Sequence, residues 1–198
     1  MYILIDGENI DATLGVNILK RTPRAEERPR WDRVLEFDPF THKKSVEANE
    51  TSAPAETTHN STGLFFLNSS QRTAAPFVQA LLAIGWQPIQ LMSDDYERKV
   101  VDEGIQRTLE AILDVRPEAD VVLGTHDVDY LPQIEALLEA GHRVAILCFR
   151  EFLALPLAEL EDRGLIIHDL ELDVQAFNLP LNRTHPVNID DFDPYPYL

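Results

Sequence analysis

The sequence has a single cysteine, few basic residues and no long hydrophobic run. Cys148 is the only cysteine among 198 residues, which excludes an internal disulfide and a zinc site built from cysteines. The longest apolar runs, such as residues 144–149, fall far short of the roughly 20 residues that a membrane helix needs. Residues 1–6 lack the basic segment that is typical of a signal peptide. These absences predict a cytoplasmic protein with no membrane partner.

Positive charge is scarce and is concentrated in one segment. The chain has 17 Lys and Arg against 34 Asp and Glu, a formal net charge of −17. Nonspecific nucleic-acid binding depends on Lys and Arg that neutralise phosphates, so the overall charge disfavours it. Eight of the 17 basic residues nevertheless lie between Lys20 and Lys44, against five acidic ones. This stretch is either a solvated charged loop or a surface for RNA.

Short β-rich apolar runs alternate with helical patterns along most of the chain. The strands are expected at residues 2–5, 64–67, 87–92, 120–124, 143–149 and 165–168, and the helices at 74–84, 94–116, 131–140 and 152–162. The helix expected at residues 94–116 begins with a capping box, in which Asp94 is the N-cap and Glu97 follows three residues later. The alternation predicts a doubly wound α/β fold, with a mainly parallel sheet of about five or six strands and helices on both faces. Ligands then bind at the carboxyl ends of the strands, near a topological switch point.

Two stretches fall outside this alternation. Residues 45–63 are rich in Ser, Thr, Asn, Glu and Ala, and such a composition buries too little apolar surface to offset the entropy of ordering it. We therefore expect a single domain over residues 1–177 with a flexible insertion at about 20–62. Residues 178–198 form a tail rich in proline, acidic and aromatic residues. This tail is a candidate for docking on the domain or on a protein partner, and the sequence leaves open whether the chain forms a homo-oligomer.

An aspartate directly follows the first expected strand. Asp6 stands in the sequence Ile-Asp-Gly-Glu-Asn-Ile, and a carboxylate at the end of a central strand projects into the ligand crevice. Gly7 allows the backbone to turn away at this point. The alternative is a structural turn in which Asp6 or Asn9 caps the next helix.

Two further aspartates follow the strand expected at residues 120–124. Asp127 and Asp129 together form a hard-oxygen site suited to Mg²⁺ or Mn²⁺. Asp129 also fits the role of N-cap for the helix that begins near Tyr130. His126, next to these carboxylates, is more typical of a hydrogen-bonded structural group than of a ligand or a general base.

A fourth carboxylate lies on the helix expected at residues 94–116. Asp102 is adjacent to the buried face of that helix, because successive helical residues are about 100° apart. Lys99 precedes it by three residues. The alternative to a functional role is a surface ion pair worth only a few tenths of a kcal/mol.

Three short motifs appear in the order expected of one nuclease family. They are Ile-Asp-Gly-Glu-Asn-Ile at residues 5–10, Lys-x-x-Asp at 99–102 and Thr-His-Asp-Val-Asp-Tyr at 125–130. The chain therefore resembles the NYN domains of the PIN-like nuclease superfamily, over roughly residues 1–167 without the insertion. Family members typically show Ser-Gly-Asp-Ser-Asp-Phe at the third motif, where this chain has His126 and Val128 in place of the glycine and the second serine.

The resemblance implies a metal-dependent ribonuclease that acts on single-stranded RNA. Its metal site would hold one or two Mg²⁺ or Mn²⁺ ions among four catalytic carboxylates, Asp6, Asp102, Asp127 and Asp129. Converging carboxylates repel one another unless a cation neutralises them, which agrees with this assignment. Asn9 would orient the substrate or a metal-bound water, and Lys99 would stabilise phosphate charge or hold Asp102. The alternative is a catalytically weak or inactive member of the same fold that binds RNA or acts as a protein scaffold.

A phosphatase of the haloacid dehalogenase type also begins with an aspartate after its first strand. It needs a second aspartate two positions later, where this chain has Glu8. The chain also has no glycine-rich phosphate loop, no serine or cysteine nucleophile elbow and no zinc-ligand spacing. These features disfavour the corresponding enzyme classes.

The basic stretch supplies candidate substrate-binding residues, Arg24, Arg28, Arg30 and Arg33. It also contains three aromatic residues, Trp31, Phe37 and Phe40, that could stack on RNA bases. The alternative is that these aromatic side chains pin the segment to the domain.

Overall fold

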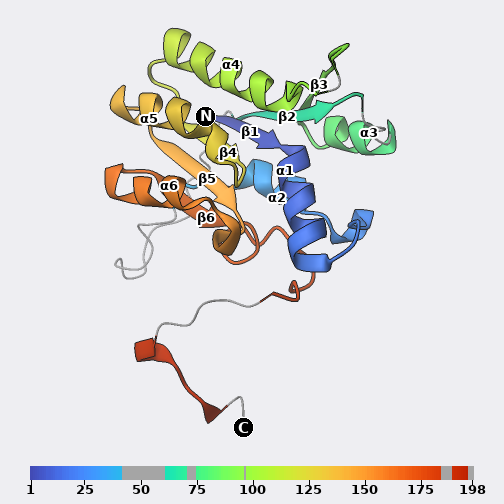
Figure 1. Ribbon diagram of the computed structural model, residues 1–198, viewed down its shortest axis with the longest axis vertical. Helices are drawn as coiled ribbons and strands as arrows, with labels where there is room; N and C mark the ends of the chain where they lie inside the picture. Colours follow the sequence, from blue (N-terminus) through green and yellow to red (C-terminus); the bar gives the residue numbers. More distant parts are fainter. Residues whose placement is uncertain (42–60, 71–74, 96, 184–188, 196–198) are drawn as a thin grey trace, which may run out of the picture.

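The computed structural model describes residues 1–41, 61–70, 75–95, 97–183 and 189–195. Within these residues six strands form one sheet in the order β3-β2-β1-β4-β5-β6, and every neighbouring pair is parallel. The strands are β1 (Tyr2–Asp6), β2 (Thr62–Asn68), β3 (Gln87–Leu91), β4 (Val121–Gly124), β5 (Val144–Cys148) and β6 (Ile166–Asp169). This arrangement confirms the predicted doubly wound α/β fold (Figure 1).

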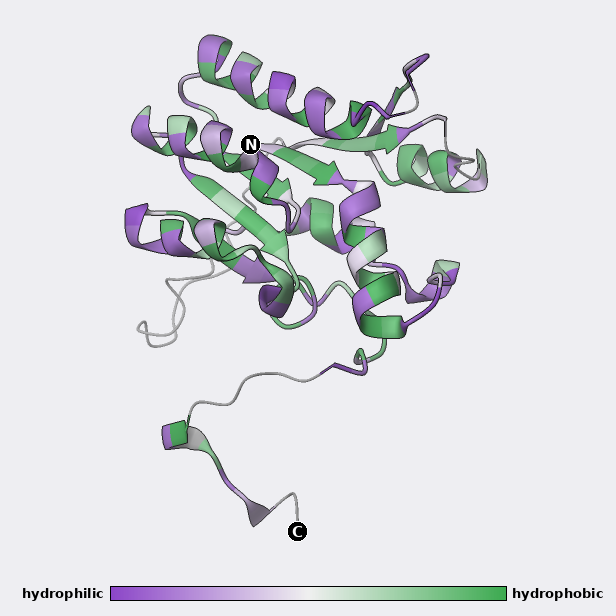
Figure 2. Ribbon diagram, viewed as in Figure 1, coloured by the Kyte–Doolittle hydropathy of each residue, from purple (hydrophilic) through white to green (hydrophobic). Residues whose placement is uncertain are grey.

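Helices cover both faces of the sheet. They are α1 (Gly7–Ala12), α2 (Trp31–Glu36), α3 (Ala75–Ala83), α4 (Val100–Val115), α5 (Leu131–Glu139) and α6 (Leu155–Ala158). One buried cluster joins α1, α2 and α3 to the sheet, and a second joins α4, α5 and α6 to the opposite face. Figure 2 shows the hydrophobic residues on the strands and on the inner sides of the helices. No helix in the described ranges is long and apolar enough to span a bilayer.

Strand β1 lies at the centre of the sheet and contributes side chains to both buried clusters. Ile3 and Ile5 pack into the first cluster and Leu4 into the second, and none of them exposes more than 1% of its surface. Side chains of a strand alternate between the two faces of the sheet, so a continuous apolar run is what burial on both faces requires. The completely apolar start of the chain is therefore explained by its central place.

The strand order reverses between β1 and β4. These strands are parallel neighbours, with Ile5 opposite Gly124, so the segments after Asp6 and after Gly124 leave the sheet at the same edge. A ligand crevice forms at such a switch point in open α/β sheets. Asp6 is the last residue of β1 and Asp127 follows β4, so the two aspartates lie at the carboxyl ends of neighbouring parallel strands.

The first turn after β1 depends on a glycine. A Cβ atom at Gly7 would lie 2.4 Å from a ring carbon of Phe65 in β2. Only a residue without a side chain lets α1 begin directly at the end of the strand while this aromatic ring packs beneath it. The close packing of β2 against this turn therefore requires the glycine after Asp6.

The expected start of helix α4 was wrong. The helix begins at Val100 with Lys99 as its N-cap, and not at Asp94. The backbone N–H of Asp95 donates to Ser93 Oγ, and the N–H of Glu97 donates to Asp95 Oδ1. These local side-chain bonds satisfy the backbone in turns and so compete with the capping box that the sequence suggested.

The prediction of a flexible insertion from residue 20 onwards was also wrong for residues 20–41. This part contains the 3-10 turn η2 (Ala25–Glu27) and helix α2, which buries Trp31 and Val34 against the sheet. The remaining part of the predicted insertion, residues 42–60, lies outside the described residues. Apolar residues at helical spacing tie α2 to the core despite the high charge around them.

The helix expected at residues 152–162 is divided into three short elements. These are η5 (Arg150–Phe152), α6 and η6 (Glu159–Arg163). Pro156 lies in the first turn of α6, and it cannot donate a backbone hydrogen bond to an upstream turn. A helix therefore cannot run unbroken from Phe152 through this proline.

Candidate metal centre

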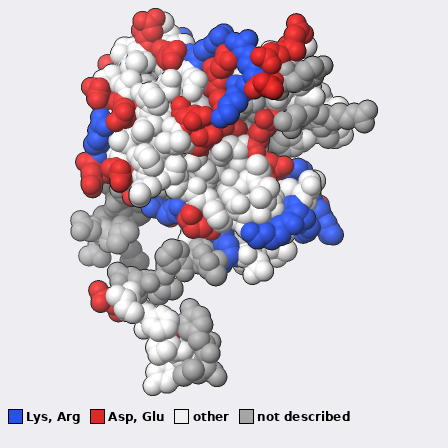
Figure 3. Space-filling model, viewed as in Figure 1, with Lys and Arg blue, Asp and Glu red and all other residues white. Residues whose placement is uncertain are grey.

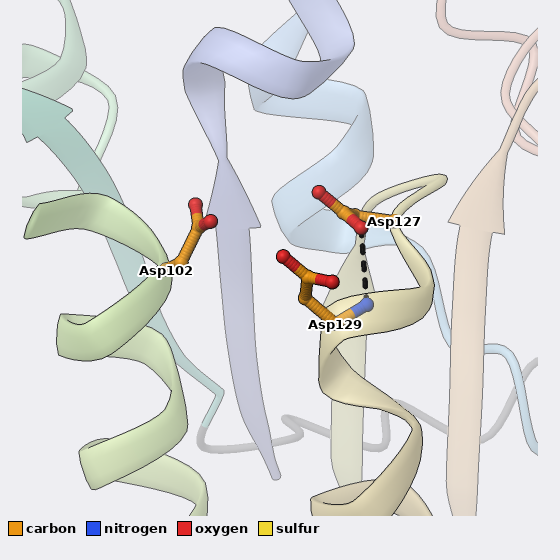
Figure 4. A group of neighbouring side chains, drawn as sticks. All are labelled: Asp102, Asp127 and Asp129. Carbon is orange, nitrogen blue, oxygen red and sulfur yellow. Dashed lines mark hydrogen bonds between the residues drawn. The ribbon is translucent and has the colours of Figure 1, made fainter. Parts of the chain in front are cut away.

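Three carboxylates converge at the switch point of the sheet. Asp102 comes from the first turn of α4, Asp127 from the loop after β4, and Asp129 from the 3-10 turn η4 (Val128–Tyr130). One oxygen from each side chain lies within 4.8 Å of an oxygen from each of the others. Figure 4 shows the three side chains pointing toward a common space between α4 and η4. The structure thus brings together three of the four carboxylates that the sequence predicted as metal ligands.

The loop after β4 fixes the two carboxylates that follow it. Asp127 is the N-cap of η4, and its Oδ1 accepts the backbone N–H of Asp129 at 3.0 Å. The backbone N–H of Asp127 donates in turn to Thr125 Oγ1 at 3.1 Å. Since the backbone is held at both residues, the two carboxylates are presented from a defined turn.

Asp6 lies beside this group but is not one of the three converging residues. It is 2% exposed, and its Oδ1 accepts the backbone N–H of Asn9 at 3.0 Å while its Oδ2 accepts the hydroxyl of Tyr130 at 2.8 Å. The structure therefore confirms the helix-cap alternative for Asp6. Its role as a metal ligand stays a prediction.

Burial dominates the electrostatics of Asp6. Removal of the carboxyl from water raises its pKa from 3.8 to about 6, although the hydrogen bonds from Asn9 and Tyr130 act in the opposite direction. The negative charge of Asp102 adds to the rise. The pKa of the Tyr130 hydroxyl is also raised, first by burial and then by the charge of Asp6. Tyr130 therefore stays protonated and donates to Asp6.

Lys99 lies between two of the three converging carboxylates. Its Nζ donates to Asp129 Oδ2 at 2.7 Å and lies 3.2 Å from Asp102 Oδ2. Hydrogen bonds to these two carboxylates raise the pKa of the ammonium group. The expectation that Lys99 holds Asp102 is confirmed, and the contact with Asp129 adds a second partner from a different element.

The charges of the cluster are only partly balanced by Lys99. Burial raises the pKa of Asp102, and the ion pair with Lys99 counteracts that rise. Among the described residues Asp127 has no basic partner, and its charge and that of Asp129 also disfavour ionisation of Asp102. Three carboxylates therefore share one ammonium group, which leaves an excess of negative charge.

The donor set fits a small divalent cation. Mg²⁺ binds oxygen ligands at about 2.1 Å, so ligands on opposite sides of the ion are about 4.2 Å apart. The separation of at most 4.8 Å between the carboxylate oxygens is close to that value. Lys99 contacts Oδ2 of both Asp102 and Asp129, so a metal ion and the ammonium group would compete for these two carboxylates.

His126 is a structural residue in the loop beside the cluster. Its Nε2 accepts the backbone N–H of Phe149 at 2.8 Å, so the proton of the neutral ring is on Nδ1. Nδ1 lies 2.9 Å from Asn9 Oδ1 and 3.2 Å from Thr13 Oγ1. Burial lowers the pKa of the imidazole to about 4. His126 is therefore neutral and links the loop after β4 to α1 and to the residue that follows β5, as expected for a structural histidine.

Asn9 completes this link from the side of α1. Its Oδ1 accepts both the backbone N–H of His126 at 2.9 Å and the ring Nδ1–H of the same residue. The side-chain oxygen is thus used to hold the loop that carries Asp127. Orientation of a substrate by Asn9 stays a prediction.

The arginines proposed to bind substrate are largely paired within the protein. Arg28 forms a two-pronged ion pair with Asp11, at 2.6 and 3.0 Å. Arg30 pairs in the same way with Asp32, and Arg33 donates to the backbone oxygens of residues 175 and 177. Arg24 is exposed. Substrate binding by these four residues stays a prediction, and three of them have a structural role.

The aromatic residues of the same segment pin it to the domain. Trp31 and Phe37 are 7% and 9% exposed, and Trp31 packs edge-on against Phe65 at 4.8 Å between ring centroids. Phe40 packs on the core cluster beneath the guanidinium of Arg143, whose Cζ is 4.6 Å from the ring centroid. The structure therefore supports the packing alternative and not base stacking for these side chains.

Part of the predicted tail is anchored by a buried arginine that the sequence did not reveal. The side chain of Arg183 is 3% exposed and forms ion pairs with Asp169, Glu171 and Glu151 at 2.5, 2.8 and 3.2 Å. Its guanidinium carbon also lies 5.1 Å from the ring centroid of Phe149. The signal available in the sequence was one isolated basic residue in an acidic tail. Residues 178–183 therefore dock on the domain beside the ends of β5 and β6.

Comparisons with known proteins give no match for this chain, whether with family models, curated proteins or solved structures. Its function is therefore argued from the geometry of the three aspartates and from the pattern of residues around them. The fold by itself hosts many unrelated activities.

Proposed function

We propose that the protein is a metal-dependent ribonuclease that hydrolyses single-stranded RNA with Mg²⁺ or Mn²⁺. The observation that carries the proposal is the convergence of Asp102, Asp127 and Asp129 within 4.8 Å at the switch point of the sheet. Resemblance of the surrounding motifs to NYN domains adds the substrate class. A bound divalent ion would supply charge neutralisation at a phosphodiester and would activate a water molecule as nucleophile.

The protein's own residues have separable parts in this proposal. Asp102, Asp127 and Asp129 would hold the ion, and the turn at η4 keeps the last two in register. Asp6 and Tyr130 are buried beside these carboxylates and are joined by the hydrogen bond from the Tyr130 hydroxyl to Asp6. Lys99, released from the carboxylates that the ion takes, would be available to a phosphate oxygen. Its side chain is 65% exposed, so it can change position without disturbing the core.

One observation favours a second candidate, an RNA-binding or scaffolding protein without catalytic activity. Lys99 already contacts two of the three carboxylates. An ammonium group in this place reduces the electrostatic need for a metal ion. A chain of this kind would retain the fold and the cluster but would bind divalent ions weakly.

The experiment that tests the proposal measures cleavage of a labelled single-stranded RNA with Mn²⁺ and with a chelator. The variant is Asp127→Asn, which keeps an oxygen for the N-cap bond to Asp129 and removes one charge from the cluster. We expect its cleavage rate to fall by more than the roughly 10–100-fold that loss of an outer-shell partner costs. Asp114→Asn is the matched control, because Asp114 is exposed on the far part of α4.

The melting temperature of the variant separates the outcomes. The metal-free Asp127→Asn variant should melt no lower than the parent, because a repulsive charge has been removed and the cap retained. Cleavage at the parental rate by this variant, or no metal-dependent cleavage by the parent, would refute the proposal. A lost rate with a lower melting temperature would assign Asp127 a purely structural role.

A further inference from the structure

The side chain of Lys99 lies among the three aspartates of the candidate metal centre. Its Nζ donates to Asp129 Oδ2 at 2.7 Å and lies 3.2 Å from Asp102 Oδ2. Figure 3 shows a group of acidic atoms near the centre of this face, with Lys and Arg atoms beside them. The ammonium group is thus a cation that already lies between carboxylates of two different elements, α4 and η4.

The three carboxylates do not depend on this lysine for their positions. Asp127 Oδ1 accepts the backbone N–H of Asp129, and the side-chain amide of Gln106 donates to the backbone oxygen of Asp129 at 3.0 Å. Asp102 is held by its place in the first turn of α4. Because these contacts fix the backbone of the cluster, the carboxylates still face one another when the ammonium group leaves.

The ammonium group of Lys99 is free to leave. The side chain is 65% exposed, while the backbone oxygen of Lys99 accepts the N–H of Glu103 at 3.1 Å and stays fixed at the start of α4. The neighbouring arginines, Arg98 and Arg107, both donate to Glu103. Lys99 is therefore the basic side chain whose release depends on the state of the aspartate cluster.

Release of Lys99 from the cluster favours an anionic partner. Binding of a divalent ion by Asp102 and Asp129 would require both contacts of the ammonium group to be given up. The freed group is a compact charge with three N–H donors, and lysine binds phosphate groups in this way. A phosphate group that lies against the ion offers acceptor oxygens at the same edge of the sheet. The release of Lys99 is therefore least costly when a phosphate group enters together with the ion.

We infer that Lys99 makes the binding of the divalent ion and of an RNA phosphate group cooperative, by moving from the carboxylates to the phosphate. This inference rests on the proposed ribonuclease function, which supplies the phosphate. In the free protein Lys99 lowers the affinity of the cluster for the ion. In the complex Lys99 contributes to phosphate binding instead, so each ligand raises the affinity for the other by the same factor. Lys99 thereby favours loading of the metal centre when substrate is present.

The test measures Mn²⁺ binding by electron paramagnetic resonance of the free ion, with and without uridine 5′-monophosphate. This nucleotide has a phosphate group but no internucleotide bond that could be cleaved. Uridine, which lacks the phosphate, is the control ligand, and a titration without protein corrects for Mn²⁺ bound by the nucleotide itself. We expect the nucleotide to tighten Mn²⁺ binding by the parent at least about tenfold, which is typical of coupled sites, and uridine to leave it unchanged.

Three variants isolate the part played by the ammonium group. Lys99→Met should bind Mn²⁺ more tightly than the parent without nucleotide, but gain at most about threefold from it, through direct contact of phosphate and ion. Lys99→Arg keeps the charge and should retain a larger gain than Lys99→Met. Arg107→Met is the matched control, because it removes the same charge from α4 at a residue that pairs with Glu103. We expect it to behave as the parent does.

The outcomes separate this inference from the proposed function. An equal gain from the nucleotide in Lys99→Met and the parent overturns the inference, even if RNA is cleaved. Weaker Mn²⁺ binding by Lys99→Met without nucleotide also overturns it, because Lys99 would then hold the carboxylates in place. A parent that binds no Mn²⁺ even with the nucleotide refutes the inference and the proposed function together. A gain that depends on Lys99 supports the inference, even if the parent fails to cleave RNA.

Discussion

Asp6 illustrates how one buried carboxylate can serve the structure at a cost in stability. The side chain caps α1 and accepts the Tyr130 hydroxyl, which joins β1 to the turn that carries Asp129. Its burial raises its pKa from 3.8 to about 6. The unfolded chain therefore ionises near pH 3.8 while the folded carboxyl stays protonated up to about pH 6, so the stability of the fold falls between these values and stays constant above them.

We predict that Asp6→Asn stabilises the metal-free protein in a pH-dependent way. Asparagine keeps an acceptor for the Asn9 N–H and can donate to the Tyr130 oxygen. At pH 4 and below the gain should be small, because ionisation of the carboxyl in the unfolded chain has only begun and both states still hold the proton to a large extent. The gain should grow between about pH 4 and pH 6, the window between the unfolded and the folded pKa, and level off above it at no more than about 3 kcal/mol, since one pKa unit corresponds to about 1.4 kcal/mol.

Chemical denaturation of both proteins between pH 4 and 8, with a chelator present, measures this difference. Asp114→Asn, at an exposed position, should show no such pH-dependent difference from the parent. A gain that is equal at every pH, or a loss that appears only above pH 6, would contradict the electrostatic account of Asp6.

Helix α2 and the segment around residue 177 stabilise each other through Arg33. This side chain donates to the backbone oxygens of Gln175 and Phe177 and to Asn178 Oδ1. Gln175 itself adopts a positive φ of 54°, which is uncommon for a residue other than glycine. The contacts of Arg33 therefore help to hold a turn that its own sequence does not favour.

We predict that Arg33→Ala lowers the stability of the fold by about 1–2 kcal/mol, because it leaves these acceptors without a charged donor. Arg107→Ala is the control, since Arg107 is largely exposed and pairs only with Glu103 in the described residues. Its effect should stay within about 0.5 kcal/mol. Thermal melting compares the two variants, and an unchanged melting temperature for Arg33→Ala would show that these contacts do not stabilise the fold.

The strands could be predicted because buried parallel strands appear as continuous apolar runs followed by turn residues. Helix starts were less predictable. At α4, the side chain of Asp95 accepts the backbone N–H of Glu97, which the predicted capping box assigns to Asp94, and Ser93 accepts that of Asp95. At α2, Trp31 and Val34 lie at helical spacing, but the surrounding arginines and acids favoured the prediction of a flexible charged insertion.

The candidate site could be predicted in part. The end of β1 and the end of β4 had to meet once the sheet was recognised, and the α4 helix brought Asp102 to the same edge. The bond from Tyr130 to Asp6 and the capture of Arg183 join residues far apart in sequence. Such contacts depend on side-chain conformation in the finished fold, for which one sequence carries no local signal.

The ion pairs of Arg183 hold the segment that follows β6 against the rest of the molecule. Burial raises the pKa of Asp169, but the pair with Arg183 and two backbone N–H groups leave it below the ordinary value. The network joins the chain beyond β6 to the segment after β5. The guanidinium also lies over Phe149, the residue whose N–H fixes His126.

We predict that Arg183→Met destabilises the protein by about 3–5 kcal/mol, because it leaves buried carboxylates without their counter-ion. Arg183→Lys should recover part of this loss, since it restores the charge without the planar geometry. Urea denaturation measures both variants. A urea denaturation curve for Arg183→Met that matches that of the parent would show that residues 178–183 do not contribute to the stability of the folded domain.

The central claim, that Asp102, Asp127 and Asp129 hold a divalent ion, is tested most directly by titrating Mn²⁺ into the metal-free protein and recording its electron paramagnetic resonance. We predict saturable binding by the parent and by Asp114→Asn, at least roughly tenfold weaker binding by Asp102→Asn, and tighter binding by Lys99→Met, because the competing ammonium is removed. Equal Mn²⁺ affinity in the parent, Asp102→Asn and Lys99→Met would contradict the account.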